Sequence, residues 1–264
     1  MVSWLSSLPV GVLVGGWLVV AVLVAAVGRL GVRALVPTEE WDHVPQIAPS
    51  LMPALGAAFA ILAALTLAGE AGYLRTAEGL VSDEAAAASL LAWAATSPGV
   101  DSEPIHSALR DYLETTRTHE WADSNASSGN DPATARAIAR LEKEVRAEAA
   151  RPEVGSPARS ELLTSLDAVT SSRRARIAAA SREIPALCVG TLVVSGLALV
   201  FNGGAVTFRS SLRTALLAVG LAIVVGLSLA LLFSISAPWS GPLVVSGHPL
   251  DAIIHDLQTG FFRG

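Results

Sequence analysis

The chain has 264 residues, of which 52% are hydrophobic and 16% are charged, and this composition excludes an ordinary soluble domain of this size. The net charge of −5 argues against a nucleic-acid partner, because nucleic acids are bound mainly by neutralising phosphates with an excess of Lys and Arg. We therefore predict an all-α integral membrane protein whose first partner is the lipid bilayer.

Four apolar, charge-free segments predict four membrane-spanning helices, because about 20 apolar residues suffice to cross the hydrocarbon core. They cover residues 2–28, 44–69, 184–208 and a stretch from 214 to beyond 236. The second helix is expected to begin near Ser50, behind a run of prolines. The third and fourth helices are expected to form a hairpin whose turn includes Asn202, Gly203 and Gly204.

The segment between the second and third spans carries most of the charged residues and predicts a separate helical domain. Ser102 followed by Pro104 marks one helix start, and Asp131 followed by Pro132 marks another. A third helix carries an apolar stripe from Leu162 to Val169. We thus expect a first transmembrane helix pair (1–73), a helical cytoplasmic domain (74–183), a second transmembrane pair (184–237) and a C-terminal interfacial tail (238–264). The short amphipathic helix of this tail lies either on the membrane or against the central helices.

A cluster of arginines beside the third span predicts the orientation. It consists of Arg173, Arg174, Arg176 and Arg182. The positive-inside rule then favours a cytoplasmic location for residues 74–183 and, with four spans, for both termini. The basic residues are almost all arginine, which is typical of a GC-rich bacterial genome. We therefore expect a multi-pass protein of the bacterial inner (cell) membrane.

Neither an enzyme nor a cofactor-binding protein is expected. The five histidines are not spaced as metal ligands, and no phosphate-binding loop or nucleotide fingerprint is present. Two pairs, His119 with Glu120 and Asp251 with His255, could be drawn as dyads. We interpret both pairs as parts of solvated helix faces.

The second span carries two faces of interest. Small residues recur every four positions along one of them, at Gly56, Ala60, Ala64, Ala68 and Gly72. We name this the small-residue ridge; it predicts close helix packing, within the protomer or between protomers, with a narrow pore wall as the alternative. Thr66 and Glu70 share another face. If that face lines a symmetric axis, Glu70 forms a carboxylate ring that attracts cations. Otherwise Glu70 is an interfacial carboxylate paired with Arg75 or another arginine.

This arrangement resembles the bestrophin-like domain family of bacterial membrane proteins. The resemblance rests on the second span running into Glu70 and on residues 109–112, 120–121, 162–166, 173–174, 185 and 238–241. The chain departs from the family pattern at Gly69, where we expect an aromatic residue, and at Ser236, where we expect Asp. The resemblance implies a link to bestrophins, which are pentameric anion channels with cytosolic helices below the pore.

Two functions follow as expectations. The first is a homo-oligomeric, bestrophin-like membrane protein that conducts ions, with a cation preference if Glu70 forms a ring. The second is a non-conducting membrane anchor or scaffold whose cytoplasmic helical domain docks a partner protein.

Overall fold

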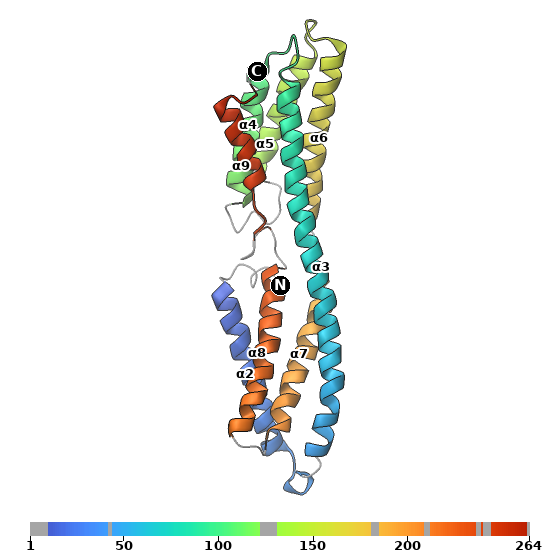
Figure 1. The fold of residues 1–264 in the computed structure, drawn as a ribbon, viewed down its shortest axis with the longest axis vertical. Coiled ribbons are helices and arrows are strands. Elements are labelled where there is room, and N and C mark those ends of the chain that lie inside the picture. Colours follow the sequence, from blue (N-terminus) through green and yellow to red (C-terminus); the bar gives the residue numbers. More distant parts are fainter. Residues whose placement is uncertain are drawn as a thin grey trace. The chain divides into compact units, whose positions relative to one another are not determined.

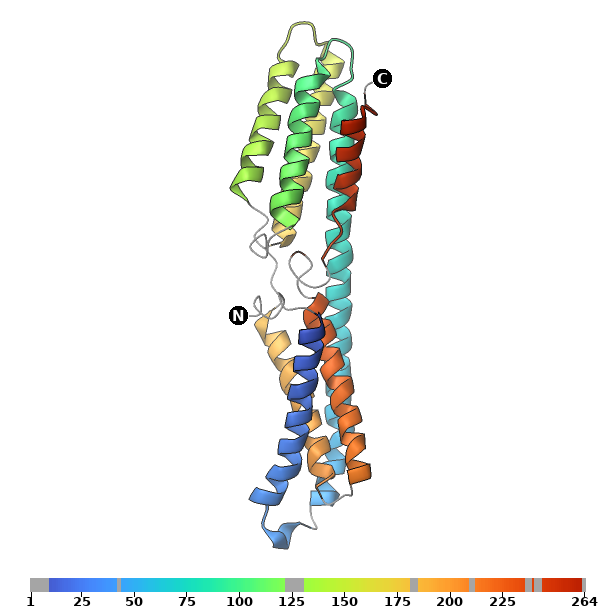
Figure 2. The same cartoon turned by 90° about the vertical axis from the view of Figure 1, so that its left-hand side faces the viewer.

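The computed structural model describes residues 10–41, 44–121, 131–180, 185–208, 212–235, 239 and 244–262. Within these residues the chain is all-helical, with eight α-helices, one short 3-10 helix and no strand (Figures 1 and 2). The α-helices are α2 (Val10–Leu35), α3 (Val44–Ala94), α4 (Ser102–Trp121), α5 (Pro132–Ala149), α6 (Ser156–Ala180), α7 (Ala186–Val206), α8 (Leu212–Ile235) and α9 (His248–Thr259). The helices α2, α3, α7 and α8 are long and apolar enough to cross a membrane, as predicted.

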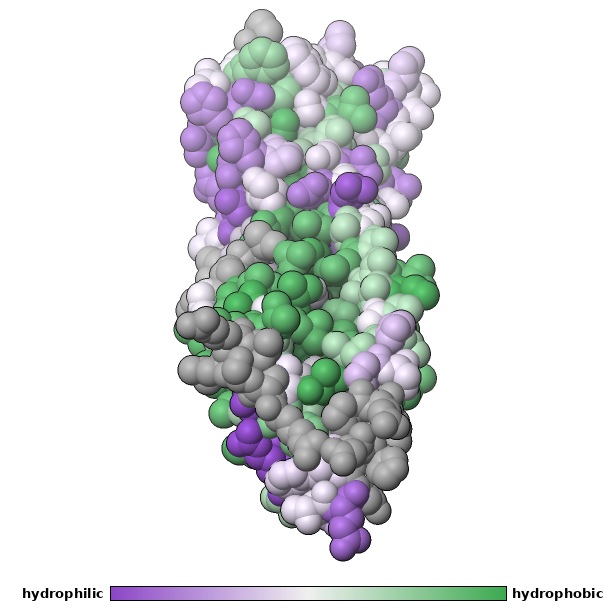
Figure 3. Space-filling view, turned by 60° about the horizontal axis from the view of Figure 1, so that its bottom comes forward, coloured by the Kyte–Doolittle hydropathy of each residue, from purple (hydrophilic) through white to green (hydrophobic). Residues whose placement is uncertain are grey.

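The chain divides into two compact units, which are described separately. Unit 1 comprises residues 1–72, 183–237 and 241–243, and unit 2 comprises residues 73–182, 238–240 and 244–264. The long helix α3 contributes its first part to unit 1 and its second part to unit 2. In Figure 3, hydrophobic residues gather over the helices of unit 1, whereas hydrophilic residues are common over those of unit 2.

In unit 1, α2 packs against both α7 and α8. The backbones of α2 and α7 come so close that only glycine fits at two positions. A Cβ atom added at Gly28 would lie 2.3 Å from the carbonyl oxygen of Phe201, and one added at Gly204 would lie 2.0 Å from that of Ala25. Helices in lipid associate largely through such close packing, because burial of apolar surface drives no association there. The two glycines therefore define the α2–α7 contact.

Two sequence-based expectations for the spans are wrong. Asn202, Gly203 and Gly204 do not form the turn, since α7 continues through them to Val206. The glycines serve helix packing instead of chain reversal. The helix of the second span does not begin near Ser50 but at Val44, with Pro49 and Pro53 inside it, although the candidate span within this helix starts at Pro49. Transmembrane helices tolerate internal prolines because neighbouring groups can satisfy the freed carbonyl groups.

The helix starts predicted for unit 2 are confirmed. Helix α4 begins at Ser102. Helix α5 begins directly after Asp131, whose carboxylate accepts hydrogen bonds from the backbone N–H groups of Ala133 (2.7 Å) and Thr134 (3.3 Å). This is an N-cap, which satisfies donors that have no partner within the helix.

The C-terminal helix α9 packs against α4. The Arg117 guanidinium donates two hydrogen bonds to the Asp251 carboxylate, at 2.6 and 3.0 Å, and the indole N–H of Trp121 donates to the carbonyl oxygen of Val245 at 2.9 Å. The sequence allows α9 to lie either on the membrane or against the central helices, and in the structure it packs against the central helix α4.

Candidate functional site

The small-residue ridge of α3 lies on the outer surface of unit 1. Ala60, Ala64 and Ala68 are exposed in the single chain. Gly56 and Gly72 are half-buried, and a Cβ atom added at either would meet no other atom within 4 Å. The side-chain positions of the ridge therefore face outward, where lipid or another protein chain can contact them.

Glu70 lies on a different face of α3. Six residues separate it from Ala64, which corresponds to a rotation of roughly 240° about the helix axis. Phe59, Ala63 and Glu70 are buried in unit 1, with 5% of Glu70 exposed. Phe59 packs against α7, because a Cβ atom added at Gly196 would lie 2.9 Å from its ring.

Thr66, the second polar residue predicted for this face, is half-buried, and its hydroxyl donates a hydrogen bond to the carbonyl oxygen of Leu62 at 2.7 Å. Glu70 has an interaction partner. Burial and a partner fit the interfacial carboxylate. A ring of Glu70 carboxylates would form only if this buried face of α3 turned toward the symmetry axis when several copies assemble.

The arginines of the predicted juxtamembrane cluster differ in their surroundings. Arg174 is exposed, whereas Arg173 and Arg176 are buried in unit 2. Arg182 lies outside the described residues. Burial of a guanidinium is costly unless it is paired and hydrogen-bonded, so the two buried arginines require acidic partners.

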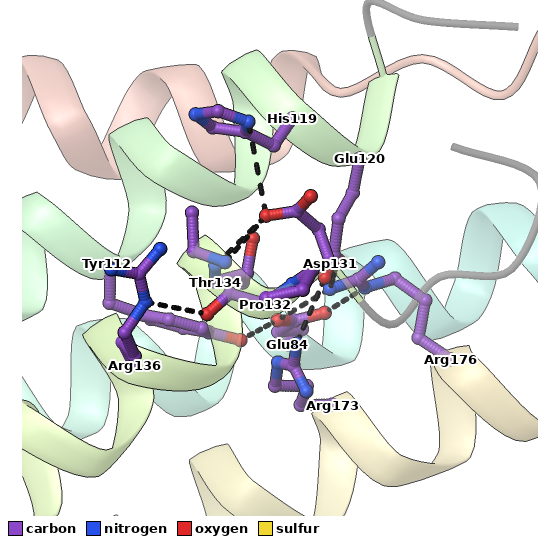
Figure 4. Close-up of polar contacts among 11 residues, drawn as sticks. Glu84, Tyr112, His119, Glu120, Asp131, Pro132, Thr134, Arg136, Arg173 and Arg176 are labelled. Carbon is purple, nitrogen blue, oxygen red and sulfur yellow. Dashed lines mark hydrogen bonds and ion pairs between the residues drawn. The ribbon is translucent and has the colours of Figure 1, made fainter. Parts of the chain in front are cut away.

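Those partners are Glu84 of α3 and Glu120 of α4 (Figure 4). The Nε atom of Arg176 lies 2.5 Å from Oε2 of Glu84, and its Nη2 atom lies 2.6 Å from Oε2 of Glu120. The second contact is an ion pair without the alignment of a hydrogen bond. Arg173 donates from Nη2 to Oε1 of Glu120 at 2.9 Å. We name these four residues the buried ionic cluster; their formal charges sum to zero.

Two aromatic side chains complete the surroundings of the cluster. The phenol of Tyr112 donates a hydrogen bond to Glu84. Burial and the neighbouring Glu84 carboxylate together raise the pKa of Tyr112 well above its usual value. The Arg176 guanidinium carbon lies 5.1 Å from the ring centroid of Trp121, which is a cation–π geometry. Burial lowers the pKa of Arg176, but the Glu84 and Glu120 carboxylates outweigh this effect and the pKa is raised.

The local sequence explains why these charges are buried. In α3 the buried positions 77, 81, 84, 88 and 91 follow an alternating spacing of four and three residues, as in helices that pack side by side. In α6 the same spacing links Leu162, Leu166 and Val169 to Arg173 and Arg176. Both apolar stripes therefore contain charged residues at core positions, and these charged residues meet.

One sequence-based interpretation needs revision here. Glu120 is not part of a solvated face, because it is 2% exposed and pairs with both arginines. Its neighbour His119 is exposed, and the Nδ1 atom of His119 lies 3.8 Å from the Oδ1 atom of Asp131. Glu84 was missed altogether. The signal that could have identified it is its place in the regular core spacing of α3.

The cluster can hold three helices in register, because it links α3, α4 and α6 through charge-assisted hydrogen bonds. Its carboxylates are occupied by guanidinium groups. Among the residues that the structure describes, no group of three or more His, Cys, Asp or Glu side chains is arranged to hold a metal ion.

Comparisons with known proteins agree with this architecture. A crystal structure of a bacterial bestrophin homologue from Klebsiella pneumoniae is similar to this chain, with a TM-score of 0.71 and 12% sequence identity, over 92% of this chain and 96% of that chain. The crystal structure of a singly substituted membrane protein matches with a TM-score of 0.73 and 12% identity, over 93% and 97% of the two chains. At these identities the likeness shows the fold alone. No curated protein matches this chain.

The family model of the bestrophin-like domain matches residues 19–250. This match covers most of the chain and includes all four candidate spans in large part, together with α4, α5 and α6. The chain therefore belongs to the bestrophin-like domain family.

Proposed function

We propose that the chain forms a homo-oligomer in the bacterial inner membrane and conducts ions along an axis bordered by α3. The observation that carries the proposal is the exposure of Ala60, Ala64 and Ala68 on one face of this helix. Membership of the bestrophin-like domain family supports it, because bestrophins are channels built from several copies of one chain.

The exposed faces of the other spans differ in chemistry from the ridge. Val27 of α2 is 58% exposed and Leu217 of α8 is 75% exposed, and large apolar side chains of this kind suit contact with lipid tails. Small side chains suit close contact between helices. We infer that α2 and α8 face lipid, whereas the ridge of α3 faces a neighbouring copy or the axis.

The deciding experiment measures the mass of the purified protein in detergent and the release of ions from liposomes that contain it. We expect the purified protein in detergent to have a mass of several protomers, and liposomes containing it to release trapped KCl faster than empty liposomes. A monomer would refute the proposal, since a pore on this plan needs several copies. An oligomer without flux would refute conduction and support the scaffold.

The ring of Glu70 carboxylates is a separate proposal. If the inner face of α3 turns to the axis on assembly, the conductance prefers cations, and Glu70→Gln reduces that preference. Reversal potentials of reconstituted protein under a KCl gradient measure this directly. A chloride preference that is insensitive to Glu70→Gln would eliminate the ring.

We also propose that residues 74–183 and both termini face the cytoplasm. Cysteine labelling in intact cells tests the orientation, in a Cys188→Ala background that removes the only native thiol. The substitution sites are Thr38 and Ala139, both of which are exposed. We expect a membrane-impermeant maleimide to label Thr38→Cys but not Ala139→Cys. The reverse result would invert the topology.

A further inference from the structure

An exposed aromatic surface lies at one end of unit 2. It consists of Leu90 and Trp93 of α3 and Phe261 just after α9, which are 59%, 46% and 60% exposed. We name these residues the aromatic knob. The rings of Trp93 and Phe261 meet edge to face with centroids 5.7 Å apart, and Trp93 also packs on the buried Phe262 at 5.2 Å. The knob is therefore held in place although it is exposed.

A pocket of about 290 Å³ lies on other helices of the same unit. It is lined by Arg146, Ala149, Ala150, Arg159 and Leu163. We name it the α5–α6 pocket. Besides the two arginines, the pocket is lined by the apolar residues Ala149, Ala150 and Leu163, which can contact an apolar ligand. Leu163 is 37% exposed.

Both guanidinium groups of the pocket are positioned by their own chain. Arg146 donates two hydrogen bonds to Glu142, at 2.9 and 2.7 Å. Arg159 donates to the carbonyl oxygen of Val154 at 3.3 Å. Positioned guanidinium groups can stack on aromatic faces.

The knob and the pocket lie at the same end of unit 2 but on different sides. A Cβ atom added at Gly99, just beyond α3, would lie 2.5 Å from the carbonyl oxygen of Glu153, between α5 and α6, so the two loops are in contact. Helix α4 packs against both α5 and α9 (Figure 2). One chain therefore cannot fill its own pocket with its own knob.

We propose that the aromatic knob of one copy docks into the α5–α6 pocket of a second copy. This proposal rests on the homo-oligomer proposed above, in which unit 2 faces water. Exposed apolar patches on water-facing surfaces mark interaction sites, and here the same chain carries an open pocket whose two guanidinium groups can stack on the aromatic rings of the knob. A contact between two different surfaces of one chain is head-to-tail, and such contacts form a ring when the rotation between copies closes.

Crosslinking in membranes tests the contact in the Cys188→Ala background. We expect a short bismaleimide to convert the double variant Phe261→Cys/Leu163→Cys into a ladder of multimers. Each single variant should remain uncrosslinked, because a head-to-tail contact does not bring two copies of one position together. Leu90→Cys with Leu163→Cys repeats the test if Phe261→Cys disturbs α9.

The matched control pairs Phe261→Cys with Ala139→Cys, which lies on α5 ten residues before Ala149, roughly 15 Å along the helix. This pair should give no ladder. Dimers from Phe261→Cys alone would overturn the proposal, because they indicate knob against knob. An oligomeric mass without a ladder would also overturn it, yet leave the proposed homo-oligomer intact, whereas a monomeric mass would refute both.

Discussion

Replacing Arg176 by methionine tests the buried ionic cluster most directly. Methionine keeps an unbranched side chain but removes the charge, so Glu84 and Glu120 lose their shared partner. These carboxylates are 0% and 2% exposed. Removing one partner of a buried ion pair typically costs about 3 to 5 kcal/mol, because the remaining charge stays buried. A domain is usually stable by only about 5 to 15 kcal/mol, so a loss of this size would lower the denaturation midpoint strongly.

The matched control is Arg174→Met on the same helix. Arg174 is exposed, and exposed substitutions usually change stability by less than about 0.5 kcal/mol. Chemical denaturation in detergent, followed by far-UV circular dichroism, measures both variants. Equal losses in Arg176→Met and Arg174→Met would refute the reasoning.

A double variant sharpens the test of the same cluster. Glu84→Gln combined with Arg176→Met removes the carboxylate whose arginine partner the single variant deletes, whereas Glu120 keeps its hydrogen bond from Arg173. Residues in direct contact usually couple by about 0.5 to 3 kcal/mol. We therefore expect the double variant to be more stable than the sum of the two single losses implies, and strict additivity would show that the contact carries no energy.

Three further predictions follow from packing, assembly and titration. Gly204→Ala should destabilise the protein by about 1 to 3 kcal/mol or more through overpacking. Gly190→Ala on the same helix should be tolerated, because a Cβ atom added there meets nothing within 4 Å. Thermal melting in detergent compares the two variants. Ala64→Leu should reduce the oligomeric fraction in size-exclusion chromatography without lowering the stability of the protomer, and unchanged assembly would show that the ridge faces lipid. The pKa of Tyr112 is raised in the folded protein, so the protonated phenol contributes stability that is fully present below the unfolded pKa of about 10. As the pH rises from the unfolded toward the folded pKa, the free energy of unfolding falls by about 1.4 kcal/mol per pH unit. Denaturation on both sides of that pH should show a slope that Tyr112→Phe removes, and the same slope in both proteins would exclude Tyr112 as its source.

The helical architecture was predictable because its signals are local. A charge-free run of apolar residues predicts a span, and Asp131 before Pro132 predicts a capped helix start; the structure has both. The errors come from residues whose role depends on a distant neighbour. Gly204 indicates a turn when only its sequence neighbours are considered, but in the structure it makes room for Ala25 of another helix.

The buried ionic cluster could be predicted only in part. The sequence shows the arginines as a basic cluster beside the third span and Glu120 next to His119, but no local pattern pairs them. Glu84 and Arg176 are 92 residues apart in the chain. Only the regular core spacing of α3 and α6 points to burial, and the spacing does not say which charges meet.

The separation of 92 residues between Glu84 and Arg176 also has a consequence for biosynthesis. At a translation rate of about 5 to 20 residues per second, Arg176 is synthesised roughly 5 to 20 s after Glu84. During that interval the Glu84 carboxylate has no Arg176 to neutralise it and is better solvated than buried. The second part of α3 therefore cannot complete its final packing while it emerges from the ribosome, and completes it only after α6 has been made.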